Sequence, residues 1–137
     1  MQRALLWTLA LSALLACTSS SAADRSRLAA GVWGGQHIRL DVADDGTAAA
    51  ELDCAHGTIS EPILPDNSGA FRAAGTYARE HHGPIREGEG DTSAPTVYSG
   101  TVKGGQMTLT ITLTGSKEEL GPFELAQGKT PRLTKCL

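Results

Sequence analysis

Cysteine is the residue type in this chain with the most definite chemistry, and the three cysteines fall at Cys17, Cys54 and Cys136. Cys17 closes an apolar N-terminal run, which leaves Cys54 and Cys136 as an even pair. Two distant thiols in an oxidising compartment predict a disulfide. A reactive thiol pair is the alternative, but redox motifs place their two cysteines close together in sequence.

Histidine and aspartate near the first of these cysteines raise the question of a metal site. The hairpin register given below places His37 opposite Asp53, and His56 follows Cys54 by two residues. Zinc and copper both accept imidazole and carboxylate ligands. We favour an ordinary surface contact between His37 and Asp53, and we expect neither a metal nor any other cofactor.

Motifs of known enzyme classes are missing from the sequence. It contains no Gly-x-Ser-x-Gly elbow, no paired-histidine zinc helix, no phosphate-binding glycine loop and no nicotinamide fingerprint. We therefore assign no catalytic residue and expect a non-catalytic protein. The net charge of −3 comes with no basic cluster, so nucleic acid is not an expected partner.

The N-terminus has the layout of an export signal. Arg3 precedes a largely apolar run of thirteen residues, which is too short for a permanent membrane helix of about 20 residues. The run ends in Leu14-Leu15-Ala16-Cys17, which resembles the lipobox of bacterial lipoproteins. The resemblance implies that residues 1–16 are removed and that Cys17 carries a lipid. A cut after Ala23 would instead release a secreted protein.

The rest of the chain then divides into two parts. Residues 17–30 are small and polar, and are expected to form the lipidated cysteine and a flexible tether. Residues 31–137 are enough for one domain. The expected location is the bacterial cell envelope, facing the periplasm or on the outer membrane, with the lipid as the only membrane contact. Thr18 after the cysteine favours the outer membrane, because the lipoprotein signal for inner-membrane retention is Asp there.

Short alternating runs from Gly31 onward predict an all-β domain. Asp44-Asp45-Gly46 is typical of a hairpin loop, and it sets one register for the strands on either side. The expected partners are Ile38 with Leu52, Leu40 with Ala50 and Val42 with Ala48 on the core face, and Arg39 with Glu51 on the outer face.

A second hairpin is expected around Gly104-Gly105. Its core-facing partners are Val102 with Met107, Gly100 with Leu109 and Tyr98 with Ile111, and its outer partners are Thr101 with Thr108 and Ser99 with Thr110. Apolar and polar partners sort onto opposite faces, as they do in a sheet with one buried side.

Weaker strands are expected at residues 58–64, 70–79, 123–126 and 132–136. The total is about eight, and an up-and-down barrel or curled meander with one disulfide is the expected closure, with a β-sandwich as the alternative. Residues 78–95 contain almost nothing apolar, and we favour a mobile solvated excursion there over a binding loop.

The start of the domain, Gly31-Val32-Trp33, resembles the Gly-x-Trp opening of lipocalins and avidin-type barrels, the calycins. That resemblance implies that Trp33 closes one end of a small barrel and that Arg132 packs over it. The domain is also similar to small bacterial envelope lipoproteins.

The expected inner face carries small residues at positions where larger ones usually fill a barrel: Ala48, Ala50, Ala73, Gly75 and Gly100. This predicts a narrow core or a small cavity, and the candidate lining residues are Trp33, Phe71, Tyr77 and Tyr98.

Three functions follow as hypotheses. The first is an envelope lipoprotein that binds a small apolar ligand or a neighbouring envelope protein. The second is a periplasmic inhibitor of a protease or lysozyme, because inhibitors of that kind are also eight-stranded barrels with a disulfide. The third is a metal-dependent enzyme that uses His37, Asp53 and His56.

Overall fold

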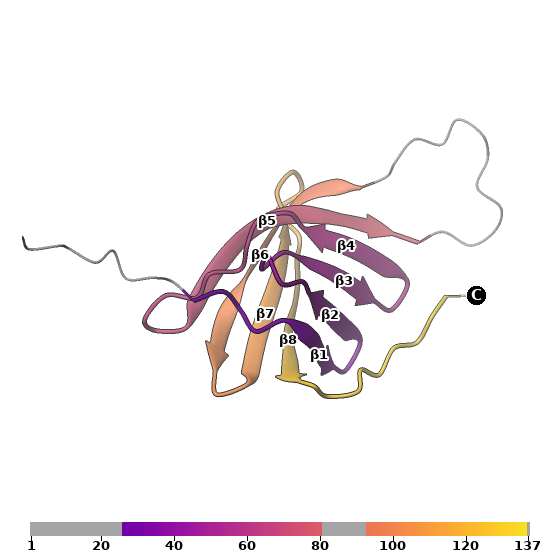
Figure 1. The fold of residues 1–137 in the computed structure, drawn as a ribbon. Coiled ribbons are helices and arrows are strands. Elements are labelled where there is room, and N and C mark those ends of the chain that lie inside the picture. The colour runs from indigo at the N-terminus through magenta and orange to yellow at the C-terminus, as the bar shows by residue number, and fades with distance from the viewer. Residues whose placement is uncertain (1–25, 81–92, 137) are drawn as a thin grey trace, which may run out of the picture.

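The computed structural model describes residues 26–80 and 93–136, and these residues form one closed antiparallel barrel. Each strand pairs with the next along the chain, and the last pairs with the first (Figure 1). The strands are β1 (Gly31–Gly35), β2 (Ile38–Val42), β3 (Ala48–Leu52), β4 (Ala55–Ile59), β5 (Ala70–Arg79), β6 (Ala94–Lys103), β7 (Gln106–Leu113) and β8 (Glu119–Gln127). The up-and-down barrel is confirmed, and the sandwich alternative is wrong. The described part of the chain contains no helix that is long and apolar enough to cross a membrane.

Both predicted hairpins are confirmed in register. β2 and β3 pair Ile38 with Leu52, Leu40 with Ala50 and Val42 with Ala48. β6 and β7 pair Tyr98 with Ile111, Gly100 with Leu109 and Val102 with Met107. In both hairpins the apolar partners face the barrel interior and are mostly buried, as the alternation requires.

The outer face of the first hairpin differs in one contact. Arg39 lies opposite Glu51 as predicted, but its guanidinium forms two hydrogen bonds with Asp41, at 2.9 and 3.1 Å. Glu51 instead pairs with Lys135 at 2.6 Å. Asp41 is two residues away on the same strand and so points to the same face, which lets Arg39 meet both of its oxygens.

The strand expected at residues 58–64 is displaced. β4 begins earlier and ends at Ile59, and the chain then leaves the sheet. Pro62 cannot donate to a ladder, which is consistent with a strand that stops before it. Ile63 folds back over the barrel end, fully buried, with its N–H donated to the carbonyl oxygen of Gly46 at 2.9 Å.

The barrel closes at a different place from the one expected. A turn at Gln36 and His37 divides the predicted first strand into β1 and β2. β1 then pairs with β8 through only three residue pairs, at residues 33–35 and 125–127. Residues 132–136, expected as the last strand, form only an isolated bridge from Arg132 to Gln36.

The small residues on the inner face have a structural explanation. The ring of Tyr98 is fully buried beside Gly57 and Gly75, and a Cβ on Gly75 would lie 2.9 Å from the ring. The Tyr98 hydroxyl donates to the carbonyl oxygen of Thr76 at 2.7 Å. Small residues on β4 and β5 therefore make room for one large aromatic side chain that occupies the barrel.

Candidate functional site

The two ends of the barrel are different. The end with the β2–β3 loop, the connection at residues 60–69 and the turn at Gly104-Gly105 is called the mouth here. The opposite end, with the β1–β2, β3–β4 and β7–β8 turns, is called the base. Residues 26–30 lie against the mouth, and the C-terminal tail runs to the base (Figure 1).

Residues 26–30, expected as the end of the tether, pack against the barrel. Leu28 is 6% exposed, and its N–H donates to the carbonyl oxygen of Ile63 at 2.9 Å. The indole N–H of Trp33 donates to the carbonyl oxygen of Ala29 at 3.0 Å. Two neighbouring residues of this segment are therefore fixed to the mouth.

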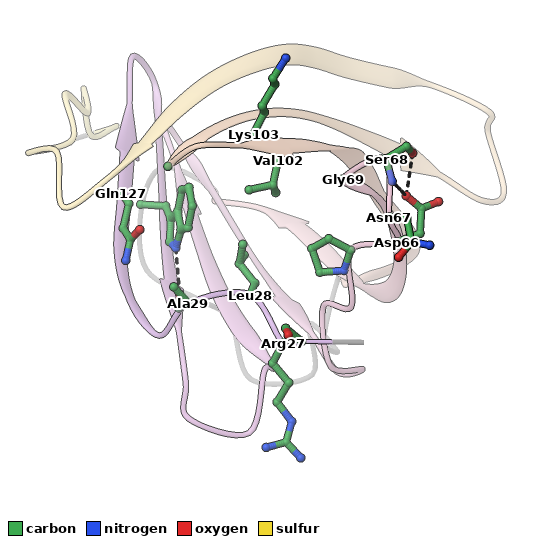
Figure 2. Close-up of a pocket in the computed structure, with 14 residues that line it drawn as sticks. Arg27, Leu28, Ala29, Asp66, Asn67, Ser68, Gly69, Val102, Lys103 and Gln127 are labelled. Carbon is green, nitrogen blue, oxygen red and sulfur yellow. Dashed lines mark hydrogen bonds between the residues drawn. The ribbon is translucent and has the colours of Figure 1, made fainter. Parts of the chain in front are cut away.

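A hollow of about 670 Å³ lies at the mouth, beside this segment (Figure 2). Its walls come from the N-terminal segment, the loop before β5, the β6–β7 turn and the end of β8, and its lining residues include Leu28, Trp33, Pro65, Asn67, Val102 and Gln127. The volume falls within the range of about 300–1,000 Å³ typical of small-ligand sites.

The lining of this hollow is mixed, with apolar side chains beside serine, asparagine and charged residues. Leu28 and Val102 point into it, whereas the charged ends of Arg27 and Lys103 point away (Figure 2). Asp66 on the rim is engaged in its own turn, where its carboxylate accepts hydrogen bonds from Ser68 and from the N–H of Ala70. The arrangement offers both apolar and polar contacts to a small molecule.

Of the four aromatic residues proposed as pocket lining, Trp33 lines the mouth hollow. Phe71 lines a second hollow of about 570 Å³, formed with residues of the 60–66 connection. Tyr77 and Tyr98 are buried inside the barrel and line neither hollow. Sequence reasoning missed Leu28, although it is the only large apolar residue between Thr18 and Ala30 and was visible for that reason.

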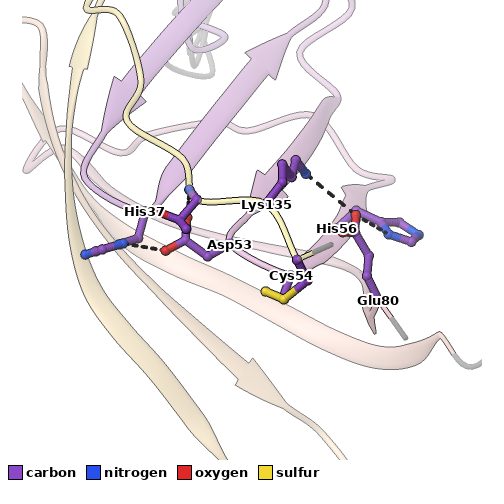
Figure 3. Close-up of a disulfide and its surroundings, with 8 residues drawn as sticks. His37, Asp53, Cys54, His56, Glu80 and Lys135 are labelled. Carbon is purple, nitrogen blue, oxygen red and sulfur yellow. Dashed lines mark hydrogen bonds and ion pairs between the residues drawn. A yellow bond between two sulfur atoms is a disulfide. The ribbon is translucent and has the colours of Figure 1, made fainter. Parts of the chain in front are cut away.

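The predicted Cys54–Cys136 disulfide is present at the base (Figure 3). Cys54 sits in the β3–β4 turn with a positive φ of 54°, and the two Cα atoms are 4.9 Å apart. The tail reaches this point along the outer face of β1, where a Cβ on Gly34 would overlap the backbone of Lys129 and Pro131. The disulfide therefore fastens the tail across the weakest seam of the barrel.

The base also carries a chain of charged contacts (Figure 3). His37 Nδ1 and Asp53 Oδ2 are 2.5 Å apart, and the N–H of Thr134 donates to Asp53 Oδ1 at 2.6 Å. The Thr134 N–H lowers the pKa of Asp53 most strongly, and the hydrogen bond from His37 lowers it further. Lys135 lies between Glu51 and Glu80, and its hydrogen bond with Glu51 raises its pKa.

The three candidate metal ligands separate into two pairs. His37 meets Asp53, whereas His56 turns to Glu80, with Nδ1 and Oε1 3.6 Å apart. Within residues 26–80 and 93–136, no three His, Cys, Asp or Glu side chains are grouped as a metal site would need. These contacts link the tail to β3 and to the β3–β4 turn.

Arg132, expected over Trp33, is exposed, and its backbone bridges Gln36. Cys17, the alternative cut after Ala23 and the middle of the 78–95 segment lie outside the described residues. The ends of that segment extend the barrel, because β5 continues to Arg79 and β6 begins at Ala94.

No protein-family model, curated protein or solved structure matches this chain. The class rests on the fold itself: a small, closed, eight-stranded antiparallel barrel with one disulfide, compatible with a calycin-like fold.

Proposed function

We propose that this protein is a non-catalytic binding module of the bacterial cell envelope, anchored by a lipid on Cys17, which takes a small, largely apolar ligand in the mouth hollow. The observation that carries the ligand proposal is the hollow itself, in which Leu28, Trp33 and Val102 supply the apolar part of a mixed lining. The barrel behind it is occupied by Tyr98, so the mouth is where a ligand has room.

The envelope location is supported by two features that agree. The disulfide between Cys54 and Cys136 is typical of proteins in an oxidising compartment. The N-terminal residues resemble an export signal that ends in a lipobox at Cys17. The non-catalytic assignment rests on the missing motifs of known enzyme classes in the sequence.

Native mass spectrometry of the protein purified from its own host tests the ligand. We expect a mass above that of the lipidated polypeptide, and the excess should be lost on unfolding. Trp33 is the only tryptophan after removal of residues 1–16 and lines the hollow, so its emission should shift when the ligand is extracted and restored. A bare lipidated mass and an unchanged emission would both count against a retained ligand.

A pair of matched variants locates the site. Val102→Phe places a larger side chain in the hollow, whereas Val97→Phe makes the same change on the same strand but on the outer face. We expect Val102→Phe to lose the bound mass and Val97→Phe to keep it. Equal retention by both variants would place the ligand elsewhere.

A further inference from the structure

We infer that the mouth of the barrel faces the membrane, so that the hollow opens toward the lipid surface and the disulfide end points away from it. This inference rests on the proposed lipid anchor at Cys17. It adds to that proposal an orientation and an interaction surface, and the partner of that surface is the phospholipid bilayer.

The first step is the point at which the chain joins the barrel. The Leu28 N–H is bonded to Ile63, the Leu28 side chain is buried, and the next residue accepts the Trp33 indole N–H. All of these contacts are at the mouth. A lipid attached before residue 28 therefore holds the protein by its mouth and not by its base.

The second step is the distance that the chain between Cys17 and Leu28 can span. Cys17 and Leu28 are eleven residues apart, so their Cα atoms are separated by at most about 40 Å. A coil of that length has an end-to-end distance of only about 17–20 Å. The ten residues of β5 run from mouth to base over about 30 Å. The base could reach the membrane only if the tether were stretched along the whole barrel, which costs entropy.

The third step is the surface chemistry of the mouth. Leu64 is the one large apolar side chain that is exposed in the described part of the chain, at 38%, and it lies in the connection that crosses the mouth. Arg27 and Lys103 are also exposed there, together with Asp44, Asp45, Glu61 and Asp66, and the charge of Arg27 acts on Asp45. At the base, Arg79 and Lys135 are paired with Glu118 and Glu51, and Lys117 is exposed in the β7–β8 turn. The exposed leucine suits the boundary between headgroups and acyl chains.

Energy transfer from the protein to labelled lipid tests the orientation. The protein is expressed with its own signal, purified with its lipid and placed in vesicles of equal parts phosphatidylethanolamine and phosphatidylglycerol that contain an acceptor lipid. A donor dye is attached in Asn67→Cys at the mouth or in Thr114→Cys at the base, both exposed positions. We expect at least about twofold higher transfer from position 67, because the labels differ in height by roughly the length of β5 projected on the barrel axis, about 25 Å for a strand tilted by about 40°.

Each outcome decides a different point. Equal transfer, or higher transfer from position 114, with the Cys17 lipid confirmed by mass spectrometry, overturns the orientation and leaves the anchor intact. Absence of lipid on Cys17 overturns the anchor and the orientation together.

Leu28→Asp should release the segment from the mouth and reduce the difference between the two labels, provided that its circular dichroism spectrum remains that of the barrel. A difference that stays the same in a folded Leu28→Asp protein would contradict the role of Leu28.

Discussion

Tyr98 occupies the space that a side chain on Gly57 would fill: a Cβ on this glycine would overlap both the Tyr98 hydroxyl oxygen and the carbonyl oxygen of Thr76. Gly57 lies on β4 and Tyr98 on β6, so the two residues meet across the interior and not as strand neighbours. Their fit explains how a barrel with many small inner residues still has a packed interior.

Gly57→Ala should therefore destabilise the barrel. The added methyl group must displace either Tyr98 or the backbone of β5, and overpacking of this kind typically costs about 1–3 kcal/mol in the free energy of unfolding. Urea unfolding followed by circular dichroism measures it. Gly115→Ala is the control, because a Cβ there meets nothing within 4 Å. If the two variants were equally stable, Tyr98 would not be packed against Gly57.

Tyr98→Phe should alter the response to alkaline pH. Burial, and to a lesser extent the charge of Tyr77, raises the pKa of Tyr98 above 10.0. The stability that comes with this raised pKa is complete below pH 10.0 and is lost as pH rises through the folded value. We expect Tyr98→Phe to lose about 1 kcal/mol at neutral pH, from the missing hydrogen bond to Thr76, and to lose less than wild type above pH 10.

Tyrosinate absorbance checks the Tyr98 prediction directly. In the native protein one phenol should ionise only as the barrel unfolds, and this step should be missing in Tyr98→Phe. In denaturant both tyrosines of the wild type should ionise together. A wild-type protein in which Tyr98 ionises normally while folded would refute the burial argument.

Asp53→Asn should reduce the acid sensitivity of the protein. The Thr134 N–H and the His37 side chain lower the pKa of Asp53 below 3.8, so its contribution to stability is present above pH 3.8 and is lost as pH falls through the folded value. We expect Asp53→Asn to be less stable than wild type at pH 6 and to change less between pH 6 and pH 2. Urea unfolding across this range measures both effects. Asp44→Asn, at an exposed loop position, should follow the wild type, and identical acid profiles for all three proteins would contradict the prediction.

Replacing both Cys54 and Cys136 by serine should destabilise the barrel strongly. The crosslink joins residues 82 positions apart, and a loop of that length corresponds to about 4.5 kcal/mol on the chain-entropy model. The tail would also lose its fastening over the three-pair seam between β1 and β8. Thermal unfolding of the double variant should match that of the reduced wild type, and a variant as stable as the oxidised protein would show that the disulfide is dispensable.

The local sequence pattern was sufficient to predict both hairpins and their registers. Around Gly46 and Gly104-Gly105, a tight turn and an apolar alternation agree on one register, and a shift by one residue would expose the whole core face. The disulfide was predictable for a similar reason, because only two cysteines remain after the apolar N-terminal run. The four aromatic residues were predicted to line one pocket, whereas Trp33 lines the mouth hollow, Phe71 lines the second hollow, and Tyr77 and Tyr98 lie in the barrel interior.

The partners of charged residues depended on tertiary neighbours. Arg39 and Glu51 lie opposite each other as the register requires, yet the tail brings Lys135 to Glu51 and leaves Arg39 with Asp41. His37 contacts Asp53 as predicted, because the register of β2 and β3 continues to these two residues. His56 instead pairs with Glu80, which follows the end of β5.

By itself the sequence determined the all-β class, the hairpin registers and the pairing of Cys54 with Cys136, because each depends on alternation, turn residues or counting. Only the tertiary structure decided that residues 33–35 close the barrel against residues 125–127, that Leu28 docks at the mouth, and that Tyr98 fills the space over Gly57. Those contacts join segments far apart in the chain, and several short segments had the composition to make them. The choice among them was made by packing in three dimensions, which no local pattern records.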